Sequence, residues 1–349
     1  MKRTSLCFTT RNGVELTEGT APDVEEGQVL IQSVVSAISA GTELLFLRGE
    51  VPPAMAVDES IEQLAGAPVR YPLKYGYSMV GRVAAVGAGV DSALEGRMVF
   101  AFHPHESCFV TTPDALVKLP ADMSPEKAAL LPTMETALSL VMDAHPVVGE
   151  RVVVVGLGMV GLLVTNVLAS FSLGRLVGVD PFPRRGKEAV RLGADAVVDG
   201  GAERVVEALR SELSKSPGGT EIAGADLVLE LSGHPSGFDV AIETVGFGGR
   251  VLVGSWYGTK PMSVKSLGGS FHRKHVQVLS SQVSRLSPRW TGRWTKRRRL
   301  QTALALLERL EHGPLISHRF PLESASDAYA MLENNPQDAL QVLLEYEEP

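Results

Sequence analysis

The pattern of apolar and polar positions changes partway along the chain. Up to about residue 120, short apolar runs are separated by glycine and proline, which is typical of short β-strands. From Arg151 onward, short apolar runs alternate with amphipathic segments of helical period. The first of these runs has four consecutive valines, 152–155, a pattern typical of a strand buried on both faces. The second region therefore predicts a parallel sheet with helical crossovers.

The same pattern predicts where individual elements lie. The stretch 48–72 is polar and irregular, and we expect a surface loop with a short helix. A helix is expected from Ser124 or Pro125 to about Ala144, because Ser-Pro-Glu supplies a cap and a proline in the first turn. Strands are expected at 27–36, 81–87, 96–102, 151–156, 175–180, 195–199, 225–231, 249–255, 275–281 and 340–346. Further helices are expected at 202–213, from the loop after 285 to about Glu311, and at 324–334.

A glycine-rich turn follows the valine strand directly. Gly156, Gly158 and Gly161 fall in the order G-x-G-x-x-G, with Met159 and Val160 between the last two, and an apolar helical pattern follows. If a dinucleotide binds here, Gly156 allows a tight turn, Gly158 lets the backbone approach the pyrophosphate, and Gly161 lets the helix pack against the strand. The phosphates would then face the N–H groups of a helix N-terminus. The alternative is a turn that binds no ligand, because glycine-rich turns between a strand and a helix also occur for purely structural reasons.

An acidic residue supports the dinucleotide interpretation. The second strand ends in Asp180, nineteen positions after Gly161, close to the expected spacing of about 20 residues. Asp180 would bind the adenosine ribose hydroxyls and repel a 2′-phosphate, which favours NAD, although Arg184 leaves NADP possible. Residues 152–169 are also apolar enough to resemble a membrane span, but their glycines and polar residues argue against one.

Composition narrows the class of protein. A chain of 349 residues with 44% hydrophobic and 21% charged residues suits a globular protein of two domains. The net charge of −7 argues against a nucleic-acid partner, and no apolar leader or anchor points to a membrane, so we expect a cytoplasmic protein. The two cysteines, Cys7 and Cys108, are too few for a disulfide scaffold or a four-cysteine zinc site. The basic run 296–299 predicts the exposed start of a helix, with anion binding as the alternative.

The order of these regions resembles that of a known superfamily. The chain has a β-rich region, then an inserted nucleotide-binding region, and then a short return to the first region. This order, together with the motifs at 75–87, 156–161 and 250–255, is similar to that of the medium-chain dehydrogenase/reductases. That superfamily includes zinc alcohol dehydrogenases and quinone oxidoreductases. The resemblance implies an α/β protein: a GroES-like β-rich catalytic domain, 1–120 with 285–349, and a Rossmann domain, 121–284, with a doubly wound, parallel six-stranded sheet.

The zinc ligands of that superfamily are replaced in this chain. Zinc-dependent members have a Cys-Gly-Thr/Ser-Asp motif and a Gly-His-Glu motif, whereas this sequence has Ala40-Gly-Thr-Glu43 and Gly76-Tyr77-Ser78, with Pro132 near the last ligand. Alanine, tyrosine and proline cannot form the usual tetrahedral site, so we expect no metal. A rival metal site at His103-Pro-His-Glu106 lacks an evident third ligand.

Three further segments, 38–43, 102–105 and 280–284, look most like a zinc-lacking subgroup that also contains hydroxyethyl bacteriochlorophyllide dehydrogenase. The three tryptophans lie late in the chain, at 256, 290 and 294. Packing explains them most simply. If they share a pocket, they would favour a bulky, apolar small-molecule substrate.

Without zinc, another group must stabilise or protonate the developing oxyanion. Tyr77 replaces a ligand that would face the nicotinamide, although it is equally well explained as a core tyrosine. Glu43 and Glu135 are acids in apolar surroundings that would raise their pKa, unless arginines pair with them. Thr42 matches a residue that hydrogen-bonds substrate, and His103 is a possible proton donor. By resemblance, the residues expected to contact the cofactor beyond the loop and Asp180 are Thr136, Arg185, Ser232, Gly233 and Ser255.

These observations predict a zinc-independent oxidoreductase that transfers a hydride between NAD and an alcohol or carbonyl substrate in the cleft between its domains. One alternative is an NADPH-dependent quinone or enoyl C=C reductase, and another is a non-catalytic nucleotide-binding scaffold protein. A homodimer is expected, because strand 275–281 would be a sheet edge, and members of the superfamily pair such edges.

Overall fold

The chain forms two compact units. The computed structural model describes residues 2–52, 54–59, 61, 64–201, 204–216 and 223–347. Unit 1 consists of Met1–Pro132 and Leu307–Pro349, and unit 2 of Thr133–Leu306. The sequence predicts domain ends near 120 and 284 instead. The helices α3 (Leu131–Ala144) and α9 (Lys296–Arg309) cross the borders of the units, so no loop marks these borders in the sequence.

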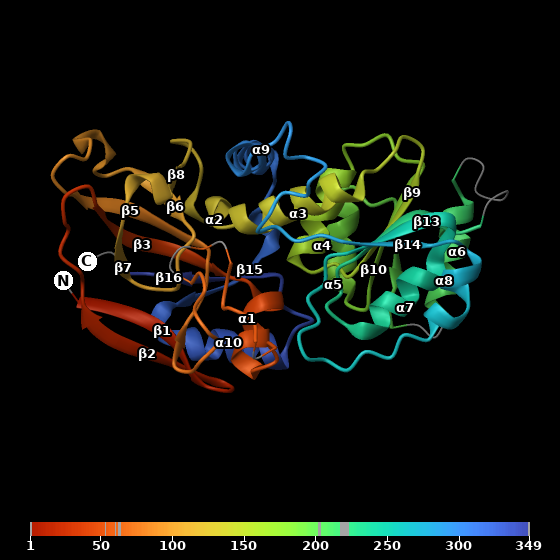
Figure 1. Ribbon diagram of the computed structural model, residues 1–349, viewed down its shortest axis with the longest axis horizontal. Helices are drawn as coiled ribbons and strands as arrows, with labels where there is room; N and C mark the ends of the chain where they lie inside the picture. The colour runs from red at the N-terminus through yellow and green to blue at the C-terminus, as the bar shows by residue number, and fades with distance from the viewer. Residues whose placement is uncertain are drawn as a thin grey trace. The chain divides into compact units, whose positions relative to one another are not determined.

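Unit 1 contains two sheets (Figure 1). The smaller has the order β2-β1-β4, and the larger has the order β15-β16-β3-β5-β6-β8, with β7 also paired to β3. The strands are β1 (Lys2–Thr10), β2 (Gly13–Thr20), β3 (Val29–Ile38), β4 (Leu73–Lys74), β5 (Met79–Val86), β6 (Met98–Ala101), β7 (Cys108–Thr111), β8 (Leu116–Lys118), β15 (Ile316–Pro321) and β16 (Gln341–Glu345). The helices are α1 (Ala40–Arg48), α2 (Pro125–Ala128) and α10 (Ala325–Asn334).

Strand β3 organises the larger sheet. Its inner residues alternate between buried and half-buried along most of its length, as expected for a strand with one face on a core. β16 pairs antiparallel with it, with Val342 opposite Ile38, and β15 pairs parallel with β16. The last part of the chain thus completes a sheet that the first part begins.

Unit 2 is built on a six-stranded sheet of order β11-β10-β9-β12-β13-β14, in which every pairing is parallel. This confirms the expected α/β class with a Rossmann-like sheet. The strands are β9 (Arg151–Val155), β10 (Arg175–Asp180), β11 (Ala196–Asp199), β12 (Ala225–Glu230), β13 (Val245–Val253) and β14 (Gln277–Ser280). Besides α3 and α9, the helices are α4 (Met159–Leu168), α5 (Pro183–Arg191), α6 (Val205–Ser214), α7 (Pro235–Thr244) and α8 (Ser270–Arg273).

The core of unit 2 follows from the strand period of two. All five residues of β9 are buried, and Val153 and Val155 on one face join alternate valines of β10, β12 and β13. Leu209 of α6 and Ile242 of α7 cover this face. The central strand is therefore buried on both faces, as its four valines predict.

The single helix expected between 124 and 144 is two helices in the structure. Ser124 caps α2, and its hydroxyl accepts the Lys127 N–H at 3.3 Å. Pro132 lies in the first turn of α3, and proline has no N–H to bond the carbonyl of Ala128. A continuous helix is therefore interrupted at this point.

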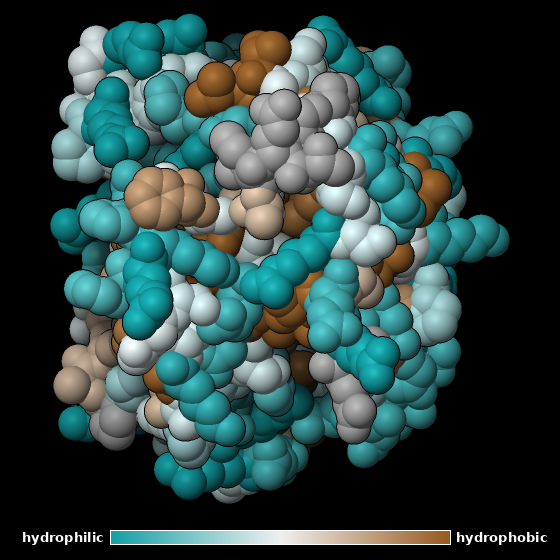
Figure 2. Space-filling model, turned by 90° about the vertical axis from the view of Figure 1, so that its right-hand side faces the viewer, coloured by the Kyte–Doolittle hydropathy of each residue, from teal (hydrophilic) through white to brown (hydrophobic). Residues whose placement is uncertain are grey.

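None of the described helices is long and apolar enough to cross a membrane. Figure 2 shows one face of the molecule, on which hydrophobic side chains gather in separate areas between hydrophilic ones. β14 lies at one edge of the six-stranded sheet. Its pairing with a second copy stays a prediction.

Candidate functional site

The glycine loop lies between β9 and α4, at the carboxyl edge of the parallel sheet, where ligands bind in folds of this type. Gly156 has φ 93°, and a Cβ on it would lie 2.5 Å from Ser232 Cα. Gly158 precedes the first turn of α4, and a Cβ there would meet nothing within 4 Å. A Cβ on Gly161 would overlap the Gly156 carbonyl oxygen. The loop therefore has a turn that requires glycine, an open stretch of backbone and a tightly packed helix start, with Met159 and Val160 beginning α4.

Asp180 ties the end of β10 to this loop. Its Oδ2 accepts the Leu157 N–H at 2.8 Å, its Oδ1 accepts the Phe182 N–H at 2.9 Å, and only 6% of the residue is exposed. Arg185 Nη1 lies 3.5 Å from Oδ2, and its guanidinium stacks on the Phe182 ring. A carboxylate has about four acceptor sites, so these three contacts leave about one for a ribose hydroxyl.

The ends of β12 and β13 meet around a buried acid that the sequence analysis missed. Glu230 is fully buried, and its Oε1 accepts both the backbone N–H of Ser232, at 2.9 Å, and its hydroxyl. The Tyr257 hydroxyl donates to Oε2. Ser255 Oγ accepts the Gly233 N–H at 2.8 Å, so the three residues predicted to contact the cofactor here gather around Glu230. The signal in the sequence was an acid directly after the apolar residues 227–229 of β12.

Three hydroxyl groups gather at the start of α1 in unit 1. The Tyr77 hydroxyl donates to Ser39 Oγ, and the side chain of Thr42 also hydrogen-bonds Tyr77. Burial raises the pKa of Tyr77 to about 12, against the opposing effect of the two hydroxyl partners. Tyr77 and Thr42 therefore lie together at the start of α1, and their action on a substrate stays a prediction.

Glu43 is fully buried and is held by donors from three segments. Its Oε1 accepts the Ser39 N–H at 2.6 Å, and its Oε2 accepts the Tyr329 hydroxyl of α10. His105 Nε2 lies 3.1 Å from Oε2. Among the described residues, no arginine pairs with Glu43, the alternative that its sequence left open. Burial, and then the Glu43 charge, raise the pKa of Tyr329 well above its usual range.

The network continues beyond His105. His105 Nδ1 lies 2.7 Å from Ser36 Oγ, which lies 2.9 Å from the Tyr346 hydroxyl. A neutral imidazole satisfies every contact if Nε2–H donates to Glu43 and Nδ1 accepts from Ser36. Gly76, with φ 115°, makes room for this ring, because a Cβ there would lie 2.5 Å from His105 Cδ2.

His103 lies outside this network. Its ring stacks on Phe109, and its Nε2 is 3.6 Å from Glu106 Oε1, too long for a hydrogen bond. Burial lowers the pKa of His103, and its role as a proton donor stays a prediction. His105, two positions on, has the contacts with Glu43. The sequence offered no way to choose between the two histidines.

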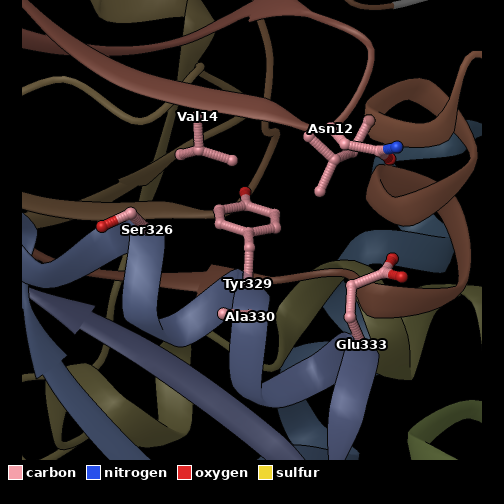
Figure 3. A pocket seen from close by; sticks show the side chains of 7 residues that line it. Asn12, Val14, Ser326, Tyr329, Ala330 and Glu333 are labelled. Atoms are coloured by element: carbon pink, nitrogen blue, oxygen red, sulfur yellow. The ribbon is translucent and has the colours of Figure 1, made fainter.

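A pocket of about 230 Å³ in unit 1 borders the same network (Figure 3). Tyr329 stands in its wall, with its ring between Val14 and Ala330 and its hydroxyl engaged by Glu43. Asn12 and Glu333 line its rim.

Glu135 in unit 2 has the ion pair that the sequence analysis considered as its alternative role. Arg299 Nε lies 3.0 Å from its Oε1, and both residues are buried. Burial raises the pKa of Glu135 against the lowering effect of Arg299. The expected exposure of the run 296–299 is therefore wrong at Arg299, which also donates to Ser139 Oγ and to the Val283 carbonyl. Thr136, the next residue, is half-buried on α3.

Two of the late tryptophans are held by packing contacts. Trp290 Nε1 donates to Asp143 at 3.0 Å, and Arg293 lies over its ring. Arg298 lies over the Trp294 ring. These cation–π contacts favour the packing explanation.

The positions of the usual zinc ligands offer no set of donors. Ala40 and Pro132 have no donor atoms in their side chains, the Tyr77 hydroxyl is bound to Ser39, and Ser78 Oγ donates to the Ala129 carbonyl. In the part of the chain that the structure describes, no three histidine, cysteine or acidic side chains cluster as metal ligands would. The residues present do not fit a tetrahedral zinc.

Comparison with known proteins points to dehydrogenases. Residues 159–305 match the family model described as zinc-binding dehydrogenase. The chain is 24% identical to L-threonine 3-dehydrogenase of Bacillus subtilis over 92% of each chain. The chain is thus homologous to dehydrogenases of this kind, and its place in a zinc-lacking subgroup stays a prediction.

Solved structures show the same fold over nearly the whole chain. A short chain alcohol dehydrogenase from Escherichia coli CFT073, complexed with NADH, has a TM-score of 0.76, 18% identity and 99% coverage of both chains. A zinc-binding dehydrogenase from Sinorhizobium meliloti 1021, bound to NADP, has a TM-score of 0.75, 18% identity and 99% coverage of both chains.

The Glu43 network generates a stability prediction. Tyr329→Phe removes a donor from a buried carboxylate, which we expect to cost about 1–3 kcal/mol and to lower the urea midpoint of unfolding. Tyr71→Phe is the matched control, because the Tyr71 hydroxyl donates to a neutral acceptor, the Phe46 carbonyl. Urea titrations of both variants make the comparison. An equal or larger loss in Tyr71→Phe would contradict a special role for the Glu43 contact.

Proposed function

We propose that the protein is an NAD(H)-dependent oxidoreductase that interconverts an alcohol and a carbonyl compound without zinc. The observation that carries the proposal is the loop of Gly156, Gly158 and Gly161, with Asp180 bonded to it at the next strand end. The sequence relatives and structural neighbours support the same class, since they are dehydrogenases and two of the neighbours hold NADH or NADP.

The residues of unit 2 fit a dinucleotide. The open backbone at Gly158 and the first turn of α4 suit the phosphates, and Asp180 suits the adenosine ribose. Arg185 would contact the same ribose, while Ser232, Gly233 and Ser255 would contact the nicotinamide half, and Thr136 would lie nearby. The charge of Asp180 disfavours a 2′-phosphate, which supports NAD over NADP. A bound nicotinamide would supply or accept the hydride.

Zinc independence rests on the chemistry of the replaced ligands. Without a metal, a hydrogen-bond donor of this chain must act at the substrate oxygen. Tyr77 is our candidate, because it replaces a ligand that would face the nicotinamide and its hydroxyl lies beside those of Ser39 and Thr42. Ser39 and Thr42 orient the hydroxyl, and Glu43 fixes Ser39 through its backbone N–H.

Cofactor preference tests the proposal first. Asp180→Asn keeps an acceptor for the Leu157 N–H but removes the charge, so we expect the preference for NADH over NADPH to fall about 10-fold, or about 1.4 kcal/mol. The matched control is Asp199→Asn, at the end of the neighbouring strand β11, which should leave the preference unchanged. Fluorescence titrations with both cofactors give the values. A wild-type preference for NADPH would favour the C=C reductases instead.

Elemental analysis tests zinc independence. Purified protein should contain far less than one zinc per chain, and dialysis against a chelator should leave its dinucleotide affinity and turnover unchanged, because the described residues offer no set of zinc ligands. Stoichiometric zinc would overturn this part of the proposal.

Substitution of Tyr77 tests the proton donor. Tyr77→Phe should lower kcat by about 100-fold and leave the dissociation constant of NADH within 2-fold, since general acid catalysis contributes about 10²–10⁴-fold. Tyr71→Phe, which also removes a tyrosine hydroxyl from unit 1, should keep kcat. Steady-state kinetics over a panel of alcohols and ketones, with parallel titrations of NADH, make the measurement. A Tyr77→Phe enzyme with wild-type kcat would exclude Tyr77 as the acid.

A further inference from the structure

Glu230 is a buried acid without a cationic partner. It is fully buried at the end of the central strand β12 and makes no ion pair within the described part of the chain. Its contacts are the Ser232 N–H, the Ser232 hydroxyl and the Tyr257 hydroxyl, all of which can donate. A carboxylate surrounded only by donors is suited to its negative form. Unit 2 therefore holds a fixed negative charge in its interior.

The surrounding backbone is shaped for this carboxylate. Gly237 lies in the first turn of α7, where a Cβ would lie 2.6 Å from Glu230 Oε1, so the absence of a side chain makes room for the carboxylate. Tyr257 reaches Glu230 from the segment after β13, and Ser255 of that segment hydrogen-bonds the Gly233 N–H. Loss of this buried carboxylate would leave three donors without their acceptor, which is costly in free energy. The acid is therefore an integral part of the structure of this site.

The carboxylate lies beside the dinucleotide loop. Glu230 pairs with Val155, the last residue of β9, and the Leu231 N–H donates to the Val155 carbonyl at 2.7 Å. Ser232, which Glu230 holds by two hydrogen bonds, abuts Gly156. In the strand order, Glu230 is on the opposite side of β9 from Asp180, the expected ribose ligand of the adenosine half. The nicotinamide half is therefore the part of the cofactor with which the charge of Glu230 would interact.

We propose that Glu230 is a positioning residue that also sets the balance between the two redox forms of the cofactor, favouring the oxidised form. This inference rests on the proposed function. The nicotinamide ring is cationic when oxidised and neutral when reduced, whereas the rest of the dinucleotide is the same in both. A fixed negative charge in a low-dielectric interior therefore stabilises the oxidised form selectively.

A purely structural role for Glu230 makes a different prediction. If the acid only supports Ser232 and Tyr257, its loss weakens both redox forms equally, and the ratio of their dissociation constants stays the same. The ratio of the two dissociation constants therefore distinguishes an electrostatic role of Glu230 from a purely structural one.

The experiment measures the dissociation constants of NAD⁺, by calorimetry, and of NADH, by fluorescence, for wild type and for Glu230→Gln. We expect the ratio Kd(NAD⁺)/Kd(NADH) to rise about 3- to 10-fold in Glu230→Gln, because the amide lacks the charge that stabilises the cationic ring. The matched control is Asp226→Asn, at the other end of the same strand, which removes one charge and should leave the ratio within 2-fold. An unchanged ratio in Glu230→Gln, or an equal rise in Asp226→Asn, overturns the inference.

ADP-ribose, which lacks the nicotinamide, separates this inference from the proposed function. Wild type that binds none of the three ligands overturns the proposed function. Wild type that binds all three, with a ratio that Glu230→Gln does not change, overturns only the inference.

Tyr257→Phe keeps the inference testable if Glu230→Gln does not fold. It leaves the carboxylate in place but removes a donor whose dipole offsets the charge, so the ratio should fall about 2-fold. A ratio equal to or above the wild-type value overturns the inference.

Discussion

Unit 1 depends on one buried carboxylate and the donors that surround it. Glu43 has no solvent to stabilise its oxygens, and a buried acid without partners would cost several kcal/mol. Ser39, Tyr329 and His105 supply the partners, and they come from the start of α1, from α10 and from the segment before β7. The first and last parts of the chain are therefore joined by polar bonds in the interior as well as by the pairing of β3 with β16.

Unit 2 also contains buried carboxylates that are held by hydrogen-bond donors, and they lie at the carboxyl edge of its sheet. Asp180 and Glu230 are both buried acids at strand ends, and each binds backbone N–H groups of a loop that would face the cofactor. They lie on either side of β9 in the strand order. Between them begins α4, whose N-terminus carries the positive end of the helix dipole. The edge thus alternates negative, positive and negative along the line where a dinucleotide would lie.

The sequence predicts the repetitive part of this architecture well. Six strands of unit 2 were expected within a few residues of their ends, except that β13 begins earlier, because buried parallel strands are short apolar runs between helical patterns. α1 was missed because its first residues, Ala40–Glu43, were interpreted only as a degenerate ligand motif. The partners of Glu43 were also beyond reach, since Tyr329 is 286 positions away and its contact depends on the tertiary fold. The choice of His105 over His103 depends on which way a ring turns beside Gly76.

The division of the chain also sets an order of events during synthesis. Unit 2 is a continuous segment, Thr133–Leu306, so all its strands are available before the last part of the chain leaves the ribosome. Unit 1 has to wait, because β16 and Tyr329 come from Leu307–Pro349. Until then, the end of β3 that pairs with β16, residues 35–38, lacks its partner strand, and Glu43 lacks its tyrosine. The nascent first unit is thus an incomplete sheet with an exposed edge, the type of species that chaperones protect from aggregation.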